Sequence, residues 1–273
     1  MFIILAGLVI FWFYFQVSKK TIYPPNKQIN ETNNNFLSII TYNIQKLPWA
    51  IKSVTPLRAL LDSYDIILLQ ECFMVPIQTL ASLFPNHWVC KGFLSGLKFK
   101  LLNSGLVILS KYQIVDARFY PFNNSNIWTS DYLCEKGLLV IRILVNGKYF
   151  YIGNTHLQSS HYKSYDGITI KQFAELERHI QKQFQNDKYI FAGDFNIDPQ
   201  DLVQHIGQTN IIAPQSPSIY IDFTTGNSQS YPLDSYSPFV YDYFITNIKI
   251  EEPEIINTLY SDHLPVHTKV DLN

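Results

Sequence analysis

Ala192-Gly193-Asp194-Phe195-Asn196-Ile197 joins an apolar run to two polar side chains. The run over residues 189–192 predicts a buried strand, and the glycine and the acid mark its end. Asp194 and Asn196 are two residues apart, so their side chains point the same way at a strand end. A carboxylate can take a proton or face a metal, and an amide can orient water or phosphate. The same hexapeptide also suits an ordinary turn, so the rest of the chain decides between the two.

Other apolar runs begin or end at residues of the same kind. Residues 65–71 predict a strand buried on both faces that stops at Glu71, and a cation is the economical partner for a carboxylate there. Taken singly, each position has a simpler explanation as a core histidine, a surface acid, a cap or a turn. Their repeated placement at strand ends predicts one site for metal-assisted hydrolysis. The set is Asn43, Gln70, Glu71, His156, Asp194, Asn196, Asp242, Asp262 and His263.

Strands and helices alternate along the chain. We expect strands over residues 36–43, 65–71, 104–110, 113–120, 138–144, 149–154, 189–192, 239–246 and 266–270, and helices over residues 55–64, 76–83, 168–184 and 199–206. Thr55-Pro56 suits a helix start, and Asn146-Gly147 suits a hairpin turn. The pattern predicts an α/β fold of two mixed sheets packed together, with helices outside, in one domain over residues 36–273.

Composition narrows the function classes. The 273 residues, 47% of them hydrophobic, can build a large core. A formal net charge of -1 without a run of basic residues disfavours a protein that holds DNA mainly through phosphates. Three scattered cysteines, Cys72, Cys90 and Cys134, predict free thiols and a reducing compartment.

The N-terminal residues 1–18 are hydrophobic and precede Lys19 and Lys20. Because no basic residue comes before the run, we expect a helical membrane anchor or signal-anchor rather than a cleaved signal peptide. The two lysines favour a cytosolic body with a single-pass anchor. Glycosylation sequons at Asn30 and Asn123 favour the alternative, a secreted or luminal domain. Residues 19–35 are rich in Asn, Pro and Lys and predict a flexible linker.

Six motifs occur in a fixed order: Thr41-Tyr42-Asn43-Ile44, Leu69-Gln70-Glu71, Thr155-His156, Gly193-Asp194-Phe195-Asn196, Asp242-Tyr243 and Ser261-Asp262-His263-Leu264-Pro265-Val266. As an ordered set they resemble the endonuclease/exonuclease/phosphatase superfamily, which has the DNase I-like fold. The resemblance spans about residues 36–270. It implies a four-layer α/β/β/α sandwich, and hydrolysis of phosphate esters with Mg²⁺, for which Mn²⁺ is an acceptable substitute.

Within that superfamily the chain is most similar to neutral sphingomyelinases. The similarity rests on residues 104–112, on Asp131 with Glu135-Lys136-Gly137, on Thr155-His156-Leu157-Gln158 and on Gln172. It implies a membrane-tethered phospholipase C that hydrolyses sphingomyelin to ceramide and phosphocholine. A DNase or abasic-site endonuclease of the same fold and a non-catalytic binding descendant are the alternatives. Tyr220-Ile221-Asp222-Phe223-Thr224 departs from the tighter pattern of these sphingomyelinases.

The resemblance also implies roles for individual residues. Glu71 with Asn43 holds the metal, and Asp262 lies near it. Asp194 and Asn196 position water and phosphate. His263, oriented by Asp242, acts as a general base or as an imidazolium, and the sequence leaves its division of labour with Asp194 open. The expected substrate-binding residues are Asp131, Lys136, Gln158, His156 and Asn196, with Lys136 and His156 also counted as catalytic. The expected partners are a phospholipid membrane, through the N-terminal segment, and a phosphodiester; nucleic acid enters only under the nuclease alternative, and a monomer is expected.

Overall fold

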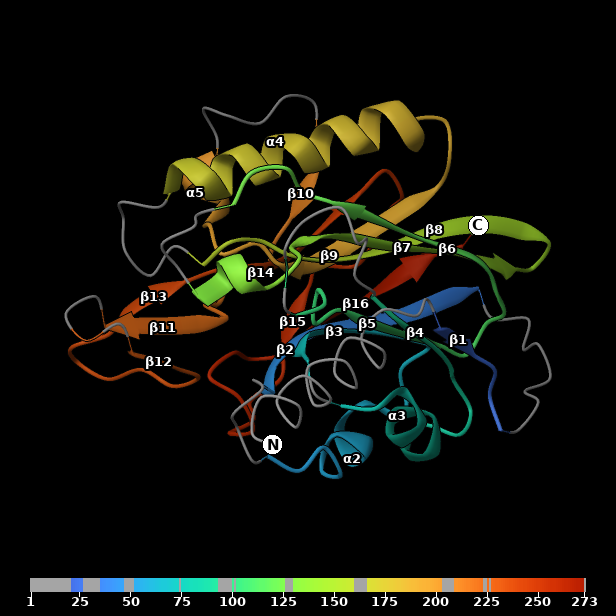
Figure 1. The fold of residues 1–273 in the computed structure, drawn as a ribbon, viewed down its shortest axis with the longest axis horizontal. Helices are drawn as coiled ribbons and strands as arrows, with labels where there is room; N and C mark the ends of the chain where they lie inside the picture. The colour runs from blue at the N-terminus through green and yellow to red at the C-terminus, as the bar shows by residue number, and fades with distance from the viewer. Residues whose placement is uncertain are drawn as a thin grey trace, which may run out of the picture.

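The computed structural model describes residues 21–26, 35–46, 52–73, 75–92, 100, 102–125, 130–159, 166–202, 209–222, 225 and 227–272. Two large sheets form its inner layers, and helices cover their outer faces (Figure 1). The predicted pair of mixed sheets in an α/β fold is therefore confirmed.

The first sheet has seven strands in the order β1-β4-β5-β3-β2-β16-β15. β2 and β3 are parallel, and the other neighbours are antiparallel. Its strands are β1 (Thr21–Tyr23), β2 (Phe36–Lys46), β3 (Ile66–Cys72), β4 (Trp88–Lys91), β5 (Val107–Ser110), β15 (Glu254–Ile255) and β16 (Val266–Asp271).

The second sheet has six strands in the order β10-β14-β9-β8-β7-β6, and β8 and β9 are its parallel pair. A small third sheet, β12-β11-β13, extends from one end of the sandwich (Figure 1). The strands of these two sheets are β6 (Ile114–Pro121), β7 (Gly137–Val145), β8 (Lys148–His156), β9 (Tyr189–Asp194), β10 (Ile211–Ile212), β11 (Ile219–Asp222), β12 (Asn227–Gln229), β13 (Ser237–Phe239) and β14 (Asp242–Thr246).

Three apolar clusters separate the layers. The first lies between the sheets and includes Ile39, Ile108 and Ile141. The second packs α2 (Leu57–Leu61) and α3 (Ile77–Leu83) on the outer face of the seven-stranded sheet. The third packs α4 (Asp166–Gln183) and α5 (Pro199–Leu202) on the outer face of the six-stranded sheet. The order helix, sheet, sheet, helix is that of the expected four-layer sandwich.

The two parallel pairs explain why polar strand ends meet. Parallel neighbours need a crossover connection, which contains α2 between β2 and β3 and α4 between β8 and β9. The two strands of each pair therefore end on the same side of their sheet. Antiparallel β14 begins there, because Asp242 pairs with Asp194, and β16 begins beside Thr41 of β2.

A polar bridge crosses the apolar interface between the sheets. Gln70 Nε2 of β3 donates to Asn154 Oδ1 of β8 at 2.7 Å, and also to Thr41 Oγ1 at 2.9 Å. Asn154 Nδ2 donates back to the carbonyls of Leu69 and Val107 at 2.8 and 2.9 Å. Both amide side chains are fully buried. Directional bonds therefore fix how the two sheets align.

Three expectations need correction. Part of the predicted linker over residues 19–35 belongs to the fold, because Thr21–Tyr23 forms β1 and pairs with β4. The helix predicted over residues 55–64 is shorter, Leu57–Leu61, and its N-cap is Pro56 without a side-chain cap. The strand predicted over residues 239–246 is two strands, because the N–H groups of Tyr241 and Asp242 turn to Ser218 Oγ.

Among the described residues, no helix combines the length and the apolar character needed to cross a membrane. The hydrophobic helix expected over residues 1–18 lies outside the described residues.

Candidate active site

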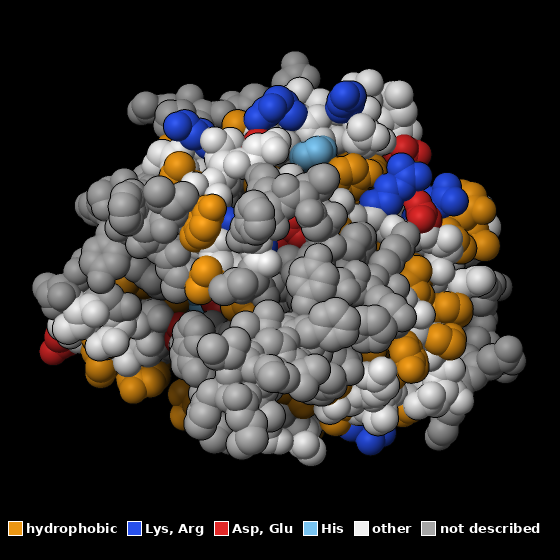
Figure 2. All heavy atoms as spheres, in the orientation of Figure 1, with side chains coloured by type: hydrophobic (Ala, Val, Ile, Leu, Met, Phe, Trp, Pro, Cys, Tyr) orange, Lys and Arg blue, Asp and Glu red, His pale blue; other side chains and the backbone are white. Residues whose placement is uncertain are grey.

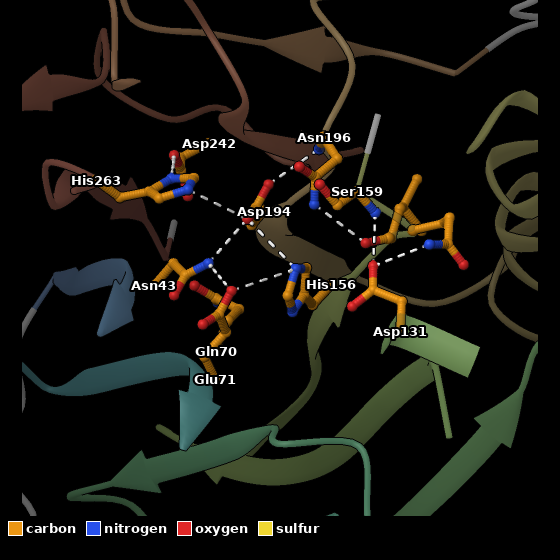
Figure 3. A network of polar contacts seen from close by, with 12 residues as sticks. Asn43, Gln70, Glu71, Asp131, His156, Ser159, Asp194, Asn196, Asp242 and His263 are labelled. Atoms are coloured by element: carbon orange, nitrogen blue, oxygen red, sulfur yellow. Dashed lines mark hydrogen bonds and ion pairs between the residues drawn. The ribbon is translucent and has the colours of Figure 1, made fainter. Parts of the chain in front are cut away.

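Six side chains converge at the shared end of the two large sheets (Figure 3). We call them the Asp194 cluster. Asn43 and Glu71 come from β2 and β3, His156, Asp194 and Asp242 come from β8, β9 and β14, and His263 comes from the loop before β16. The site therefore exists only when the two sheets are packed against each other.

Asp194 is the centre of the cluster. Its Oδ1 accepts the main-chain N–H of Asn196 at 2.9 Å, and its Oδ2 accepts Asn43 Nδ2 at 2.9 Å. The Nε2 atoms of His156 and His263 both lie 3.5 Å from Asp194 Oδ2. The side chain of Asp194 is 1% exposed. One buried carboxylate thus faces two imidazoles and one amide.

Local backbone geometry aims these groups. Glu71 and Asn196 adopt left-handed φ angles of 54° and 51°, a conformation that costs a non-glycine residue about 1–3 kcal/mol. Gly193 is required by close approach, because a Cβ there would lie 2.0 Å from the carbonyl oxygen of Thr155. Phe195 stacks on Tyr243 with ring centroids 4.0 Å apart. Packing therefore holds a strained turn between Asp194 and Asn196.

His263 is held between two acids. Its Nδ1 lies 2.7 Å from Asp242 Oδ2, and its Nε2 faces Asp194. Burial alone lowers the pKa of His263, but the charges of Asp242 and Asp194 outweigh it and raise the pKa well above its usual value. This geometry can hold a proton on the imidazole.

The positive charges around the buried carboxylates of the site do not fully offset their negative charge. Burial, followed by the charge of Asp262, raises the pKa of Glu71 to about 7. Burial, with a contribution from Asp242, raises the pKa of Asp194 to about 6 even though His263 opposes the shift. Buried carboxylates with raised pKa values are typical of groups that await a cation or a proton.

Several groups in the site are of the type that ligates metals. Among the described residues, Asp194, Asp242 and His263 offer candidate ligand atoms that all lie within 4.8 Å of one another. Asp262 presents its carboxylate from the loop before β16, where Ser228 Oγ lies 2.5 Å from Oδ2 and Ser261 Oγ lies 3.1 Å from Oδ1. Asn43 turns its amide nitrogen, not its oxygen, toward Glu71 and Asp194, at 3.1 and 2.9 Å.

A second group, the Asp131 cluster, comprises Asp131, Lys136, Gln158 and Ser159. Asp131 lies in the short 3₁₀ helix Ser130–Leu133, and its Oδ2 accepts Gln158 Nε2 at 3.0 Å and Ser159 N–H at 2.8 Å. Lys136 Nζ lies 3.5 Å from Asp131 Oδ1. The structure therefore brings Lys136 and Gln158 to the carboxylate of Asp131.

The main-chain carbonyl of Leu157 links the Asp131 cluster to Asn196, whose N–H donates to Asp194. It accepts Lys136 Nζ at 3.2 Å and Asn196 Nδ2 at 3.1 Å. On the helix side, the fully buried Gln172 accepts the N–H of Gln158 at 2.7 Å and donates to the carbonyl of Asn124 at 2.7 Å. Leu157 lies inside the predicted motif Thr155-His156-Leu157-Gln158 and Ser159 directly follows it, but both contribute main-chain atoms, which a pattern of side chains does not single out.

Two of the known proteins that this chain resembles in sequence are sphingomyelinases. The chain is 26% identical over 179 residues to Sphingomyelinase C 2 of Leptospira interrogans, a match that covers 62% of this chain and 29% of that protein. It is 27% identical over 195 residues to Sphingomyelinase C of Bacillus cereus, covering 60% of this chain and 58% of that protein. The chain thus spans less than two thirds of the length of either relative.

Solved structures share the fold. A variant of beta toxin from Staphylococcus aureus with bound magnesium ions has a TM-score of 0.61 and 18% identity, covering 85% of this chain and 98% of that chain. D. rerio TDP2 complexed with a single-strand DNA product has a TM-score of 0.66 and 16% identity, covering 87% and 99%. Residues 40–263 match the Endonuclease/Exonuclease/phosphatase family. With its predicted motifs gathered at one end of a two-sheet sandwich, the chain belongs to that family of phosphate-ester hydrolases.

Proposed function

We propose that the protein is a Mg²⁺-dependent phosphodiesterase that hydrolyses sphingomyelin to ceramide and phosphocholine. The observation that carries this proposal is the pair of histidines that face Asp194, with Glu71 beside His156 and Asp242 beside His263. The names of the sphingomyelinase relatives favour a phospholipid over other phosphate esters.

The donor set fits a hard divalent cation. Carboxylate and amide oxygens are the ligands that Mg²⁺ prefers. Glu71 and Asp262 are two carboxylates whose charges oppose each other, because the charge of Asp262, after burial, raises the pKa of Glu71. We propose Glu71 and Asp262 as metal ligands with Asn43 beside them, and Mn²⁺ as an acceptable substitute. When bound, the ion offsets negative charge on the phosphate oxygens.

Asp194 is proposed to orient the attacking water and take its proton. Asn43 and Asn196 each fix one oxygen of this carboxylate. Its raised pKa, about 6, suits a base that works near neutral pH. The water oxygen forms the new bond to phosphorus, and the bond from phosphorus to the ceramide oxygen breaks.

The two histidines are proposed to donate protons or hydrogen bonds to oxygens of the phosphate group. His263, with its pKa held well above the usual value, carries the proton that the departing ceramide oxygen needs. Asp242 fixes the Nδ1 side of that ring at 2.7 Å, so Nε2 is the atom left for transfer. His156 Nε2 is proposed to donate to a nonbridging oxygen as negative charge develops there.

The Asp131 cluster is proposed to align the substrate-binding side of the site. Lys136 is 4% exposed and donates to the Leu157 carbonyl, which also accepts a hydrogen bond from Asn196 Nδ2. Lys136 therefore acts on phosphate through the position of Asn196. Asp131 and Gln158 hold the lysine and the strand end in place.

We also propose that residues 1–18 tether the enzyme to a phospholipid membrane, on the strength of their hydrophobic sequence. Flotation of the full chain with liposomes tests the tether against a variant that lacks residues 2–18 and keeps β1. Equal flotation of the two proteins would remove this part of the proposal.

A DNase or abasic-site endonuclease is the second candidate, favoured by likeness to a structure complexed with single-strand DNA product. The net charge of -1 opposes it. On the face drawn in Figure 2, Lys and Arg side chains gather over α4, on the outer side of the six-stranded sheet. A nonspecific nuclease would be expected to line its substrate path with such charges.

One experiment separates these candidates. The full chain with Mg²⁺ is incubated with sphingomyelin vesicles and, in parallel, with supercoiled DNA and an abasic duplex. We expect phosphocholine release that EDTA stops, together with intact DNA. Nicked DNA beside intact lipid would support the nuclease instead, and inertness toward all three substrates would support a binding descendant.

A further inference from the structure

The three-stranded sheet contacts the Asp194 cluster through Ser218, the residue that precedes β11. Ser218 is fully buried, and its Oγ accepts the N–H groups of Tyr241 and Asp242 at 3.0 and 3.2 Å. Its carbonyl accepts the N–H of Leu264 at 2.8 Å. One residue therefore fixes the main chain beside Asp242 and beside His263.

Ser228 makes a second contact, from the middle of β12. Its hydroxyl donates to Asp262 Oδ2, while Ser261 Oγ donates to Oδ1. Each carboxylate oxygen has more than one lone pair, so each can accept a hydroxyl and still face a cation. The two hydroxyls together determine the direction in which the carboxylate of Asp262 points.

The two contacts belong to one rigid unit. β11 begins directly after Ser218, and β12 pairs with β11 so that Ser228 lies opposite Ile221. The fully buried Ile221 packs with Ile219 and Tyr241. The position of the Ser228 hydroxyl is therefore set by the same anchor that holds Asp242.

We propose that Ser228 is a positioning residue for the divalent-ion site and acts by holding Asp262 in its ligating orientation. This inference rests on the proposed role of Asp262 as a metal ligand. Outer hydrogen bonds to metal ligands fix their orientation, and their loss typically costs about 10- to 100-fold in metal affinity. Ser228 lies more than thirty residues from Asp262 in sequence, in a segment outside the six motifs.

The test uses a pair of variants of equal shape. Ser228→Thr keeps the hydroxyl and Ser228→Val removes it, and both β-branched side chains suit a strand. Ser237→Val is the matched control, because Ser237 is exposed and flanks the same Ile221 from the other side, on β13. Asp262→Asn tests whether the carboxylate itself binds the metal.

Binding of Mn²⁺ alone to the full chain is measured by electron paramagnetic resonance, without substrate. We expect Ser228→Val to weaken Mn²⁺ binding by about 10- to 100-fold, and Ser228→Thr and Ser237→Val to bind like the wild type. If the chain hydrolyses phosphodiesters, the metal concentration for half-maximal rate should rise with Ser228→Val while kcat at saturating metal changes little.

Two results would overturn the inference: wild-type affinity in Ser228→Val, or wild-type affinity in Asp262→Asn. If near-UV circular dichroism shows that Ser228→Val does not fold, Ser228→Ala replaces it in the same comparison. If Ser228→Val weakens Mn²⁺ binding but the wild type cleaves no phosphodiester, the role of Ser228 stands and the proposed function is wrong. The two proposals can therefore fail independently.

Discussion

The Asp194 cluster and the Asp131 cluster are linked through Asn196 and the Leu157 carbonyl but differ in how closely positive charge matches their carboxylates. Asp131 is met by an ammonium, an amide and a main-chain N–H within 3.5 Å. In the Asp194 cluster, the imidazole of His156 lies 3.5 to 3.9 Å from its two carboxylate neighbours. The pKa values of Glu71 and Asp194 are raised there, and two residues adopt left-handed backbone.

The contrast separates a scaffold from a reactive site. The carboxylate of Asp131 has its partners within the folded chain, whereas the Asp194 cluster keeps excess negative charge that a cation would offset. Strain and unmatched charge persist only where the surroundings hold them in place. Variants in the first cluster should therefore cost stability, and variants in the second should cost activity.

The largest effect is expected from His263→Ala. Loss of a group that transfers a proton typically lowers kcat by about 10²–10⁴-fold. Rates of phosphodiester cleavage measure the loss, and circular dichroism checks that the fold is kept. His267→Ala is the matched control, because His267 lies in β16 and pairs with Glu254 at 3.7 Å, away from the cluster. Equal losses in the two variants would contradict the assignment.

Glu71→Gln should lower activity and metal affinity while making the metal-free protein more stable. The folded pKa, about 7, lies above the ordinary value of 4.5. The folded state therefore binds more protons than the unfolded chain between these values, and wild-type stability falls as pH rises through that window. Glutamine does not titrate. Above this pH window, the free energy of unfolding of the variant should therefore exceed that of the wild type by on the order of 3 kcal/mol.

Urea unfolding in EDTA, at one pH below 4.5 and one above 7, measures this difference. Glu254→Gln is the control, because the Glu254 side chain is 77% exposed. A stability difference that does not change across the window would show that Glu71 is not a destabilised acid.

A smaller effect on activity, but a loss of stability, is expected from Asp131→Ala. The change removes the acceptor of the Ser159 N–H and the carboxylate that faces the buried Lys136, at a cost of about 1–3 kcal/mol per buried group. Chemical denaturation measures the loss. Asp116→Ala removes an acid that pairs with Arg118 at the surface, and such pairs contribute about 0–1 kcal/mol. If Asp131→Ala is as mild as Asp116→Ala, the cluster is not a scaffold.

Strand ends were the part of this molecule that the sequence predicted well. Apolar runs that stop at Glu71, His156 and Asp194 are local patterns, and the two-sheet fold follows from their alternation with helices. The predicted histidine–acid pair of His263 and Asp242 also meets, at 2.7 Å. Local patterns sufficed here because parallel strands carry their last residues to one edge.

Features set by contacts between distant residues were not predictable. The pairing of Thr21–Tyr23 with β4 overrides a composition typical of linkers. The break between β13 and β14 arises because Ser218 captures two N–H groups from a segment that reads as continuous strand. The direction of the Asn43 amide depends on Glu71 and Asp194, which are 28 and 151 residues away. No window of sequence contains such partners.

The amide bridge between Gln70 and Asn154 has a consequence for recombining this fold. Gln70 precedes Glu71, and Asn154 lies two residues before His156, so the bridge sits under the two halves of the site. Apolar layers resist sliding only weakly, since the hydrophobic effect has no direction, whereas amide hydrogen bonds weaken steeply with misalignment. A chimera that joined one sheet of this chain to the opposite sheet of a relative would keep its grafted residues in line only if it carried both amides.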